Sequence, residues 1–209
     1  MKLYLFSLPI MFLSLGCSAS YSVAVNGYSA TGQVVRIPQA ASISVVTDSN
    51  VPNPILEREV AAKIEKLLAE QGYATGADEP DYYLLFDYGI DAGRTVTDVV
   101  PIHRPGFYQP YPFSSMRWYG YTTYMSHSEV IHTRWLALRL IDGKAYRISE
   151  SAEPVWIGEL ASAGMSSDLR EIINYMLIAA FEHFAEDTQR QITEIIPKND
   201  ERVWLLTGL

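Results

Sequence analysis

The chain has 209 residues, of which 48% are hydrophobic, and its formal net charge at pH 7 is -8. This length suits one domain, or one domain with extensions, and the hydrophobic content is sufficient for a proper core. An acidic protein is a poor candidate for binding nucleic acid or anionic lipid through its surface charge, so we expect no nucleic-acid partner.

Residues 1–17 have the anatomy of a secretory signal. Lys2 supplies a positive start, residues 3–15 form an almost unbroken apolar run, and Gly16 precedes the only cysteine, Cys17. The apolar run is too short for a comfortable membrane span. A signal that ends in a small residue followed by cysteine resembles the lipobox of bacterial lipoproteins. This resemblance implies that Cys17 is acylated and becomes the mature N-terminus.

The same resemblance implies a location and a redox state. The residue after the cysteine is Ser18 and not an aspartate. In bacterial lipoproteins this implies an anchor in the outer membrane that faces the periplasm. Loss of residues 1–16 removes Lys2 and changes the net charge from -8 to -9. Once Cys17 is acylated no thiol remains, so the fold has to be stable without a disulfide. The alternatives are a secreted protein with a chance cysteine and an uncleaved anchor.

The next segments predict a tether, a strand and a helix. Residues 17–40 are the lipidated cysteine and a polar, glycine-bearing tether with room for one early strand. Residues 41–47 are β-branched and predict a strand. Asn53 suits a helix cap, Pro54 the first helical position and Gly72 the left-handed residue that ends a helix. Apolar residues at helical spacing lie between these limits and predict a buried face.

Alternating patterns follow the helix. Residues 78–81 form a solvated acidic turn, because their spacing is not that of a calcium loop. Residues 82–90 alternate and predict a strand with two distinct faces. Residues 94–100 alternate again, and we expect them to pair with the preceding strand across a turn at residues 91–93.

An insert at residues 101–125 breaks this regular pattern. Four prolines interrupt any helix or central strand, and many aromatic residues crowd into the same segment. Tyr and Trp offer large, rigid contact surfaces, which predicts a protein-binding or peptidoglycan-facing surface. A loop that covers a sheet edge is an equal alternative, and stacking on carbohydrate is a weaker one. The residues assigned to the binding surface are Tyr108, Tyr111, Phe113, Trp118, Tyr119 and Tyr121.

A candidate metal site comes next. His127, Glu129 and His132 follow the insert and His103 lies upstream, and zinc sites use His and carboxylate ligands. In a strand, residues 127 and 129 share a face while residue 132 points away, so the three do not converge without a bulge. The spacing matches no recurrent metal motif. We therefore predict no metal or other cofactor, and keep a metal-dependent envelope hydrolase as the alternative function.

The remaining chain predicts a meander and a closing helix. Residues 131–141 form a long strand, Asp142-Gly143 a hairpin turn that returns residues 144–149, and residues 154–162 a further strand. A capping box at Asp168 begins a helix with a broad apolar stripe.

Near the C-terminus the patterns are weaker. His183 is interpreted as a boundary residue at the end of the closing helix. Residues 202–206 are apolar, and they predict an edge strand or an apolar plug that docks on the body.

These elements predict an α+β fold, with a mixed, mostly antiparallel sheet of about five to six strands packed against two long helices. The expected organisation is a signal peptide (1–16), a lipidated cysteine and tether (17–40), the α+β domain (41–190, with the insert at 101–125) and a C-terminal extension (191–209).

The order of these elements resembles the bacterial envelope lipoproteins of domain-of-unknown-function family four-one-three-six. The matching segments are LAEQGY at residues 68–73, PDYYL at 80–84, LRLIDG at 138–143 and Val155-Trp156. The resemblance covers residues 41–187 and departs from the family in its aromatic insert and at Ile157. It implies an α+β envelope domain and supplies no catalytic residues.

No sequence signature of catalysis accompanies this resemblance, since the chain has no Gly-x-Ser-x-Gly, no phosphate loop and no spare cysteine. We therefore expect a lipid-anchored periplasmic binding or assembly module and not an enzyme. Its partners are the membrane, through the lipid, and an envelope protein or a second copy of the chain.

Overall fold

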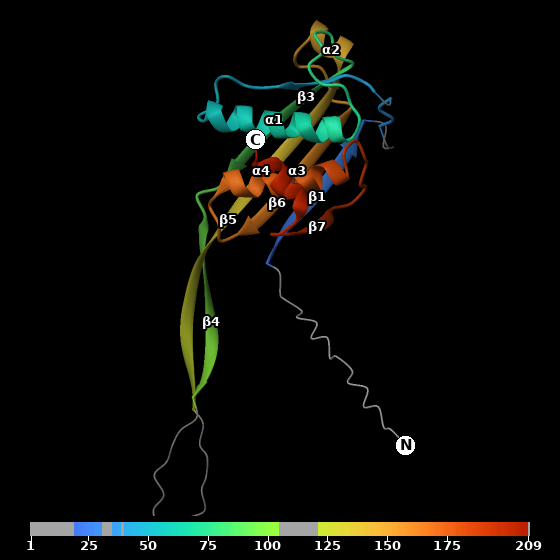
Figure 1. The fold of residues 1–209 in the computed structure, drawn as a ribbon. Coiled ribbons are helices and arrows are strands. Elements are labelled where there is room, and N and C mark those ends of the chain that lie inside the picture. The colour runs from blue at the N-terminus through green and yellow to red at the C-terminus, as the bar shows by residue number, and fades with distance from the viewer. Residues whose placement is uncertain (1–18, 31–34, 39, 105–120, 209) are drawn as a thin grey trace, which may run out of the picture.

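The computed structural model describes residues 19–30, 35–38, 40–104 and 121–208 (Figure 1). Its strands are β1 (Ser20–Ser29), β2 (Ile43–Val46), β3 (Tyr82–Ile90), β4 (Arg94–Arg104), β5 (Tyr121–Asp142), β6 (Trp156–Gly164) and β7 (Ile192–Pro197). Its helices are α1 (Pro54–Glu70), α2 (Gly143–Ile148), α3 (Leu169–Glu182) and α4 (Glu201–Thr207).

The strands form one sheet of seven, in the order β2-β3-β5-β6-β1-β7, with β4 paired to β5 outside this path. Every pairing is antiparallel except that of β2 with β3, which is parallel. The α+β class and the mostly antiparallel sheet are confirmed, and the expected five to six strands become seven. The additional strands come from segments at both ends of the described chain.

The segment expected to be a tether contains the strand β1, which lies inside the sheet between β6 and β7. Val23 and Val25 point into the core and are 0% and 2% exposed. The residues that alternate with them, Ser22, Ala24 and Asn26, are small, so the apolar signal of this strand is weak in the sequence. The early strand expected within residues 17–40 is confirmed. The folded domain therefore begins at Ser20, well before residue 41.

Helices α1 and α3 cover one face of the sheet (Figure 1). They have 17 and 14 residues, while α2 and α4 have 6 and 7. Two long helices are thus not confirmed, since residues 19–208, where described, form four helices and none of these is long. No helix among the described residues is long and apolar enough to cross a membrane.

The predicted helix limits are confirmed by their caps. Asn53 Oδ1 accepts a hydrogen bond from the Leu56 amide at 3.1 Å, and Gly72 has a φ of 90° just beyond the end of α1. Asp168 Oδ1 caps α3 by accepting from the Glu171 amide at 3.1 Å. Short polar side chains at these positions satisfy backbone amides that have no partner within the helix.

The expected hairpin at residues 142–149 is wrong, because residues 143–148 form α2. Asp142 Oδ1 accepts from the amides of Lys144 and Ala145 at 3.0 Å each, so the Asp-Gly pair begins a helix. A Cβ on Gly143 would lie 2.1 Å from the Pro80 carbonyl oxygen. Glycine is required there by the close approach of two backbones.

The C-terminal residues also belong to the fold. Strand β7 pairs with β1, and α4 buries Val203 and Leu206 in the core. The prediction that residues 202–206 dock on the body is confirmed in its apolar-plug form, while the edge strand expected as the alternative is wrong because the segment is helical.

Candidate functional site: the arm formed by β4 and β5

Strand β5 is 22 residues long and pairs with two successive strands along one side. Its residues 134–142 pair with β3, and residues 121–131 pair with β4. The hairpin expected between β3 and residues 94–100 is therefore wrong, because β4 continues the path of β3 along β5. Residues 94–104 and 121–131, here called the arm, project from the body of the molecule (Figure 1).

A bulge separates the arm from the body. Residues 91–93 lie opposite only two residues of β5, His132 and Thr133, which adds one residue to the β3–β4 side. The Asp91 amide donates to the Thr133 carbonyl at 2.9 Å, and Asp91 Oδ1 accepts from the amides of Thr133 and Gly93, each at 2.9 Å. The backbone hydrogen bond from Thr133 lowers the pKa of Asp91, and burial opposes this effect only in part. Asp91 therefore fixes the bulge as a carboxylate.

Gly93 gives the bulge its shape. Its φ is 81°, a left-handed conformation that side chains rarely adopt. A Cβ at this position would also lie 2.7 Å from atoms of His132 and Val130. Both the backbone conformation and the packing require glycine, so the base of the arm has a defined geometry.

A buried arginine in β5, Arg134, stabilises the backbone at the base of the arm. Arg134 is 0% exposed, and its Nη1 donates to the carbonyl oxygens of His132 at 3.2 Å, Gly164 at 2.9 Å and Ser166 at 3.1 Å. Burial lowers the pKa of Arg134. The side chain donates hydrogen bonds to carbonyl groups at the point where β6 ends and β5 continues into the arm. It therefore stabilises the junction between the body and the arm.

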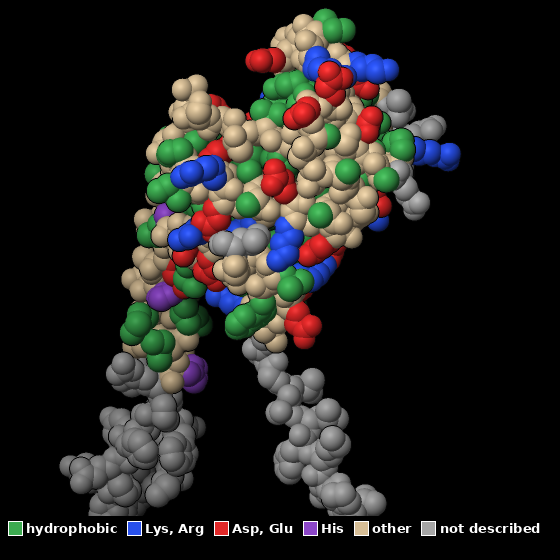
Figure 2. Space-filling view, turned by 45° about the horizontal axis from the view of Figure 1, so that its top comes forward, with side chains coloured by type: hydrophobic (Ala, Val, Ile, Leu, Met, Phe, Trp, Pro, Cys, Tyr) green, Lys and Arg blue, Asp and Glu red, His purple; other side chains and the backbone are tan. Residues whose placement is uncertain are grey.

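Exposed hydrophobic side chains gather on the arm (Figure 2), and the strand register places them on both of its faces. The large ones are Val96, Val99, Val100, Tyr124, Met125 and Val130, and they are between 42% and 73% exposed. Polar cross-strand contacts lie among them, with Thr97 Oγ1 2.9 Å from Ser128 Oγ and His103 Nδ1 2.8 Å from Thr122 Oγ1. No helix packs on the arm among the described residues, so its apolar surface meets solvent.

The arm also differs from the rest of the chain in charge. The arm contains two arginines, Arg94 and Arg104, and two acids, Asp98 and Glu129, which gives 2 − 2 = 0. The formal charge of the whole chain is -8, so the residues outside the arm carry −8 − 0 = −8. A neutral arm therefore extends from an acidic body.

Most of the predicted binding residues lie outside the residues that the structure describes. These are Cys17, Tyr108, Tyr111, Phe113, Trp118 and Tyr119. Tyr121 is the first residue of β5, and its backbone pairs with Arg104. Residues 105–120 connect the two strands of the arm in sequence, so the aromatic insert and the arm are parts of one excursion of the chain.

The candidate metal residues do not converge. His127 Nε2 lies 2.9 Å from Glu129 Oε1 on one exposed face, as predicted for a strand. His132 lies at the bulge, with its Nδ1 3.3 Å from the Asp91 carbonyl oxygen. His103 pairs with Thr122 near the far end of the arm, five residues from His127 along β5, which is roughly 16 Å. One zinc ion does not bind all of these side chains in this arrangement.

A different group of potential ligands lies in the body. Glu182, His183 and Glu194 offer ligand atoms within 4.8 Å of one another. Both ring nitrogens of His183 already contact carboxylates, Nδ1 with Glu186 at 3.1 Å and Nε2 with Glu194 at 2.9 Å. Burial alone would lower the pKa of His183, but these hydrogen bonds raise it overall. The group is best explained as a histidine that ties the end of α3 to β7 through Glu194, a role that the sequence did not indicate.

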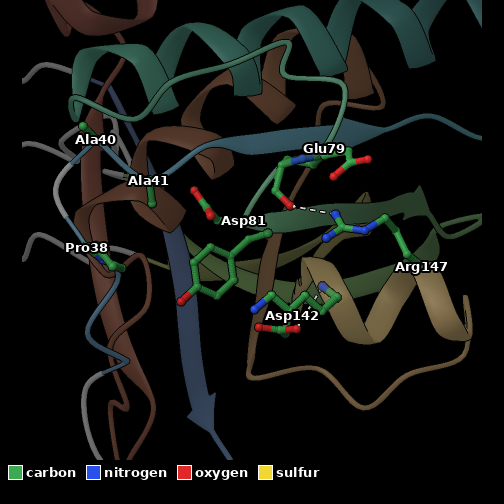
Figure 3. Close-up of a pocket in the computed structure, with 10 residues that line it drawn as sticks. Pro38, Ala40, Ala41, Glu79, Asp81, Asp142 and Arg147 are labelled. Atoms are coloured by element: carbon green, nitrogen blue, oxygen red, sulfur yellow. Dashed lines mark hydrogen bonds between the residues drawn. The ribbon is translucent and has the colours of Figure 1, made fainter.

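A pocket of about 420 Å³ lies at the opposite end of the sheet, beside α2 (Figure 3). Its charged groups serve local structure. Arg147 Nη1 donates to the Pro80 carbonyl oxygen at 3.1 Å, and Asp81 Oδ2 accepts from the amide and hydroxyl of Ser42 at 2.9 and 2.8 Å. The backbone hydrogen bond from Ser42 lowers the pKa of Asp81. The predicted solvated acidic turn thus holds one acid that anchors the segment before β2.

Residues 20–184 match the model of a family described as domain of unknown function, DUF4136. This match confirms the expected family and extends its start from residue 41 to residue 20. No curated protein matches the chain.

Two kinds of solved structure are similar in fold. A PDZ domain protein from Parabacteroides distasonis ATCC 8503 is 15% identical, with a TM-score of 0.50, and the likeness covers 86% of this chain. This chain spans 40% of that protein. PelC from Paraburkholderia phytofirmans, solved as a dodecamer, is 13% identical over 80% of this chain and 99% of PelC, with a TM-score of 0.42. The first likeness concerns the fold alone, and the second is weaker still.

Proposed function

The chain belongs to the DUF4136 family, and on that premise we propose that it is a lipid-anchored periplasmic assembly module of the bacterial cell envelope. In this proposal Cys17 carries the lipid in the outer membrane, and the arm with its aromatic insert contacts an envelope partner. The protein acts by binding and not by catalysis.

The arm is the observation that carries this proposal. An isolated two-stranded hairpin is marginally stable in water, because it has no buried face. This arm nevertheless extends over 11 paired residues on each strand and exposes six large hydrophobic side chains. Exposed apolar surface of this kind is typical of interaction sites. The arm is therefore best explained as a surface that another molecule covers.

The position of the N-terminus agrees with an anchor on the same side as the arm. Strand β1 is antiparallel to β6, and β6 ends at Gly164, which pairs with His132 at the base of the arm. Ser20 therefore lies at the end of the sheet from which the arm projects (Figure 1). Cys17 is only three residues earlier in the chain. A lipid at Cys17 would hold the base of the arm close to the membrane surface.

Crosslinking in intact cells tests the contact surface. A photoreactive residue at Tyr124 on the arm, or at Tyr111 or Trp118 in the insert, is expected to capture a discrete product. The matched control is Ile148, which is 88% exposed on α2 at the opposite end of the sheet. Equal capture from Ile148 and from the arm, or no capture from either, would contradict the proposal.

Cell fractionation tests the anchor separately. Replacement of Cys17 by Ala removes the only acylation site, so the protein is expected to move from the membrane fraction to the soluble periplasm. Unchanged membrane association of the Cys17→Ala protein would show that residues 14–17 are not a lipobox.

A further inference from the structure

We propose that two copies of this chain associate through the free edge of β5 in the arm, residues 122–130, as antiparallel strands related by a twofold axis at Ser126. The inference rests on the proposed function, because it identifies a second copy as the molecule that covers the arm.

The distal part of β5 has one side without a strand neighbour among the described residues. Strands β3 and β4 occupy one side of β5, and β6 pairs with the other side only over residues 132–140. Beyond His132, that side of β5 presents an unpaired edge. Such an edge carries rows of backbone N–H and C=O groups, which are a template for adding another strand.

The β5 edge is better suited to pairing than the β4 edge. Residues 121–131 contain neither proline nor glycine, so every residue of this segment keeps its backbone donor and acceptor. Strand β4 contains Pro101, which has no backbone N–H. Within sheets, proline is confined largely to edge strands, because it cannot donate a hydrogen bond to a further strand. The outer side of β4 is therefore the protected edge, and β5 provides the open one.

Charge favours a second copy at this edge. The residues outside the arm carry a formal −8 in each copy and repel one another, whereas the arm has a formal charge of 0. Antiparallel pairing places the two bodies at opposite ends of a joined ribbon, roughly 35 Å long for 11 residues. The Debye length at physiological ionic strength is about 8 Å, so the repulsion between the bodies is largely screened. The arm is thus the part of the surface at which two acidic copies approach with least electrostatic cost.

The side chains of β5 are compatible with the axis at Ser126. Thr123 then lies opposite Glu129 of the second copy, and Met125 lies opposite its His127, so no two like charges are directly opposed. Tyr124, which is 73% exposed, lies diagonal to Val130 of the second copy, and aromatic and β-branched side chains pack well in such positions. The product is a four-stranded antiparallel sheet in the order β4-β5-β5-β4, which no longer depends on an isolated pair of strands.

Disulfide trapping of the full chain in the cell envelope tests this geometry. Ser126→Cys places two thiols opposite one another on the axis, and it is expected to give a disulfide-linked dimer under oxidising conditions. The matched control is Val99→Cys, the cross-strand neighbour of Ser126 on β4. Its two copies would be three strand spacings apart, roughly 14 Å, which exceeds the reach of a disulfide. Absence of the Ser126→Cys dimer, or an equal yield from Val99→Cys, would overturn the inference.

A charge variant provides a second measurement. Ser126→Lys opposes two ammonium groups on the axis, and it is expected to reduce photocrosslinked dimer from Tyr124 at least tenfold, while Val99→Lys leaves it unchanged. Capture of a different protein from Tyr124, with no Ser126→Cys dimer, would overturn self-pairing and leave the proposed contact function standing. No arm-specific capture of any kind, with the Ser126→Cys dimer also absent, would overturn both.

Discussion

The two halves of β5 are the most instructive comparison in the molecule. In the body, Leu136, Leu138 and Leu140 are at most 1% exposed, because β3 and β6 flank the strand and helices cover its inner face. In the arm, Tyr124 and Met125 of the same strand are 73% and 55% exposed. One continuous backbone therefore passes from a packed core to an uncovered ribbon. Burial is decided by what lies beside the strand and not by the strand itself.

The largest expected effect is a cavity in the body. Leu138→Ala removes a side chain that is 0% exposed, so the free energy of unfolding is expected to fall by about 2–5 kcal/mol. Val99→Ala in the arm removes an exposed side chain and is expected to change it by less than about 0.5 kcal/mol. Urea unfolding of both variants measures the contrast, and similar losses would mean that the arm is as well packed as the body.

The next largest effect is expected at Arg134, which stabilises the junction between the body and the arm. Arg134→Met leaves three carbonyl groups without their donor, and we expect a loss of about 2–3 kcal/mol in unfolding free energy. The control is Arg139→Met, which removes a partly exposed ion pair with Asp87 and is expected to cost about 1 kcal/mol or less. If both variants unfold at the same urea concentration, Arg134 is not a specific support of this junction.

A smaller effect is expected at the bulge. Gly93→Ala and Gly76→Ala both place a side chain at a positive φ, but only at Gly93 does the new Cβ meet other atoms, at 2.7 Å. Gly76→Ala is expected to cost about 1 kcal/mol, and Gly93→Ala about 1–2 kcal/mol more. Hydrogen exchange should show faster exchange of arm amides only for Gly93→Ala. Unchanged exchange in the arm would show that the bulge does not set the geometry of the arm.

The smallest effect is a pH dependence confined to the body. The pKa of His183 is raised in the folded state by Glu194 and Glu186, so its stabilisation is fully present below the unfolded pKa of about 6.5. The stabilisation is lost as the pH rises through the higher folded pKa. Melting temperatures of the wild-type and His183→Gln proteins should therefore differ most below pH 6.5 and converge at alkaline pH. Glu182 and Arg202 lie beside this group and are present in both proteins, so they do not create the difference. A difference that grows with pH would contradict this assignment.

Local signals in the sequence predicted the fold class, the two main helices with their caps, and β3 with its limits. The pairing of strands was harder to predict from the sequence, because the alternation in residues 94–100 indicates a strand but does not specify which strand lies beside it. Asp142-Gly143 satisfies the requirements of a hairpin turn and of a helix cap equally well, and only the approach of Pro80 shows which applies. Strand β1 was expected only as an early strand within a tether, because its apolar alternation is limited to Tyr21, Val23 and Val25.

The candidate site was accessible only in part. The aromatic insert was visible as an unusual composition, but its connection to an uncovered arm follows from the register of β4 against β5. The free edge of β5 is equally invisible in sequence, because it depends on where β6 ends relative to a strand more than 20 residues away. The contacts of Arg134 also join segments that are distant in the chain.

The continuity of β5 has a mechanical consequence. A pull on the arm along its length is transmitted through β5 and through the β3–β4 path into the centre of the sheet. There the hydrogen bonds of β5 with β3 and β6 run across the direction of the pull, so they are loaded together in shear and are not peeled one after another. A tension applied at the arm is therefore shared by the strands that flank β5 in the body.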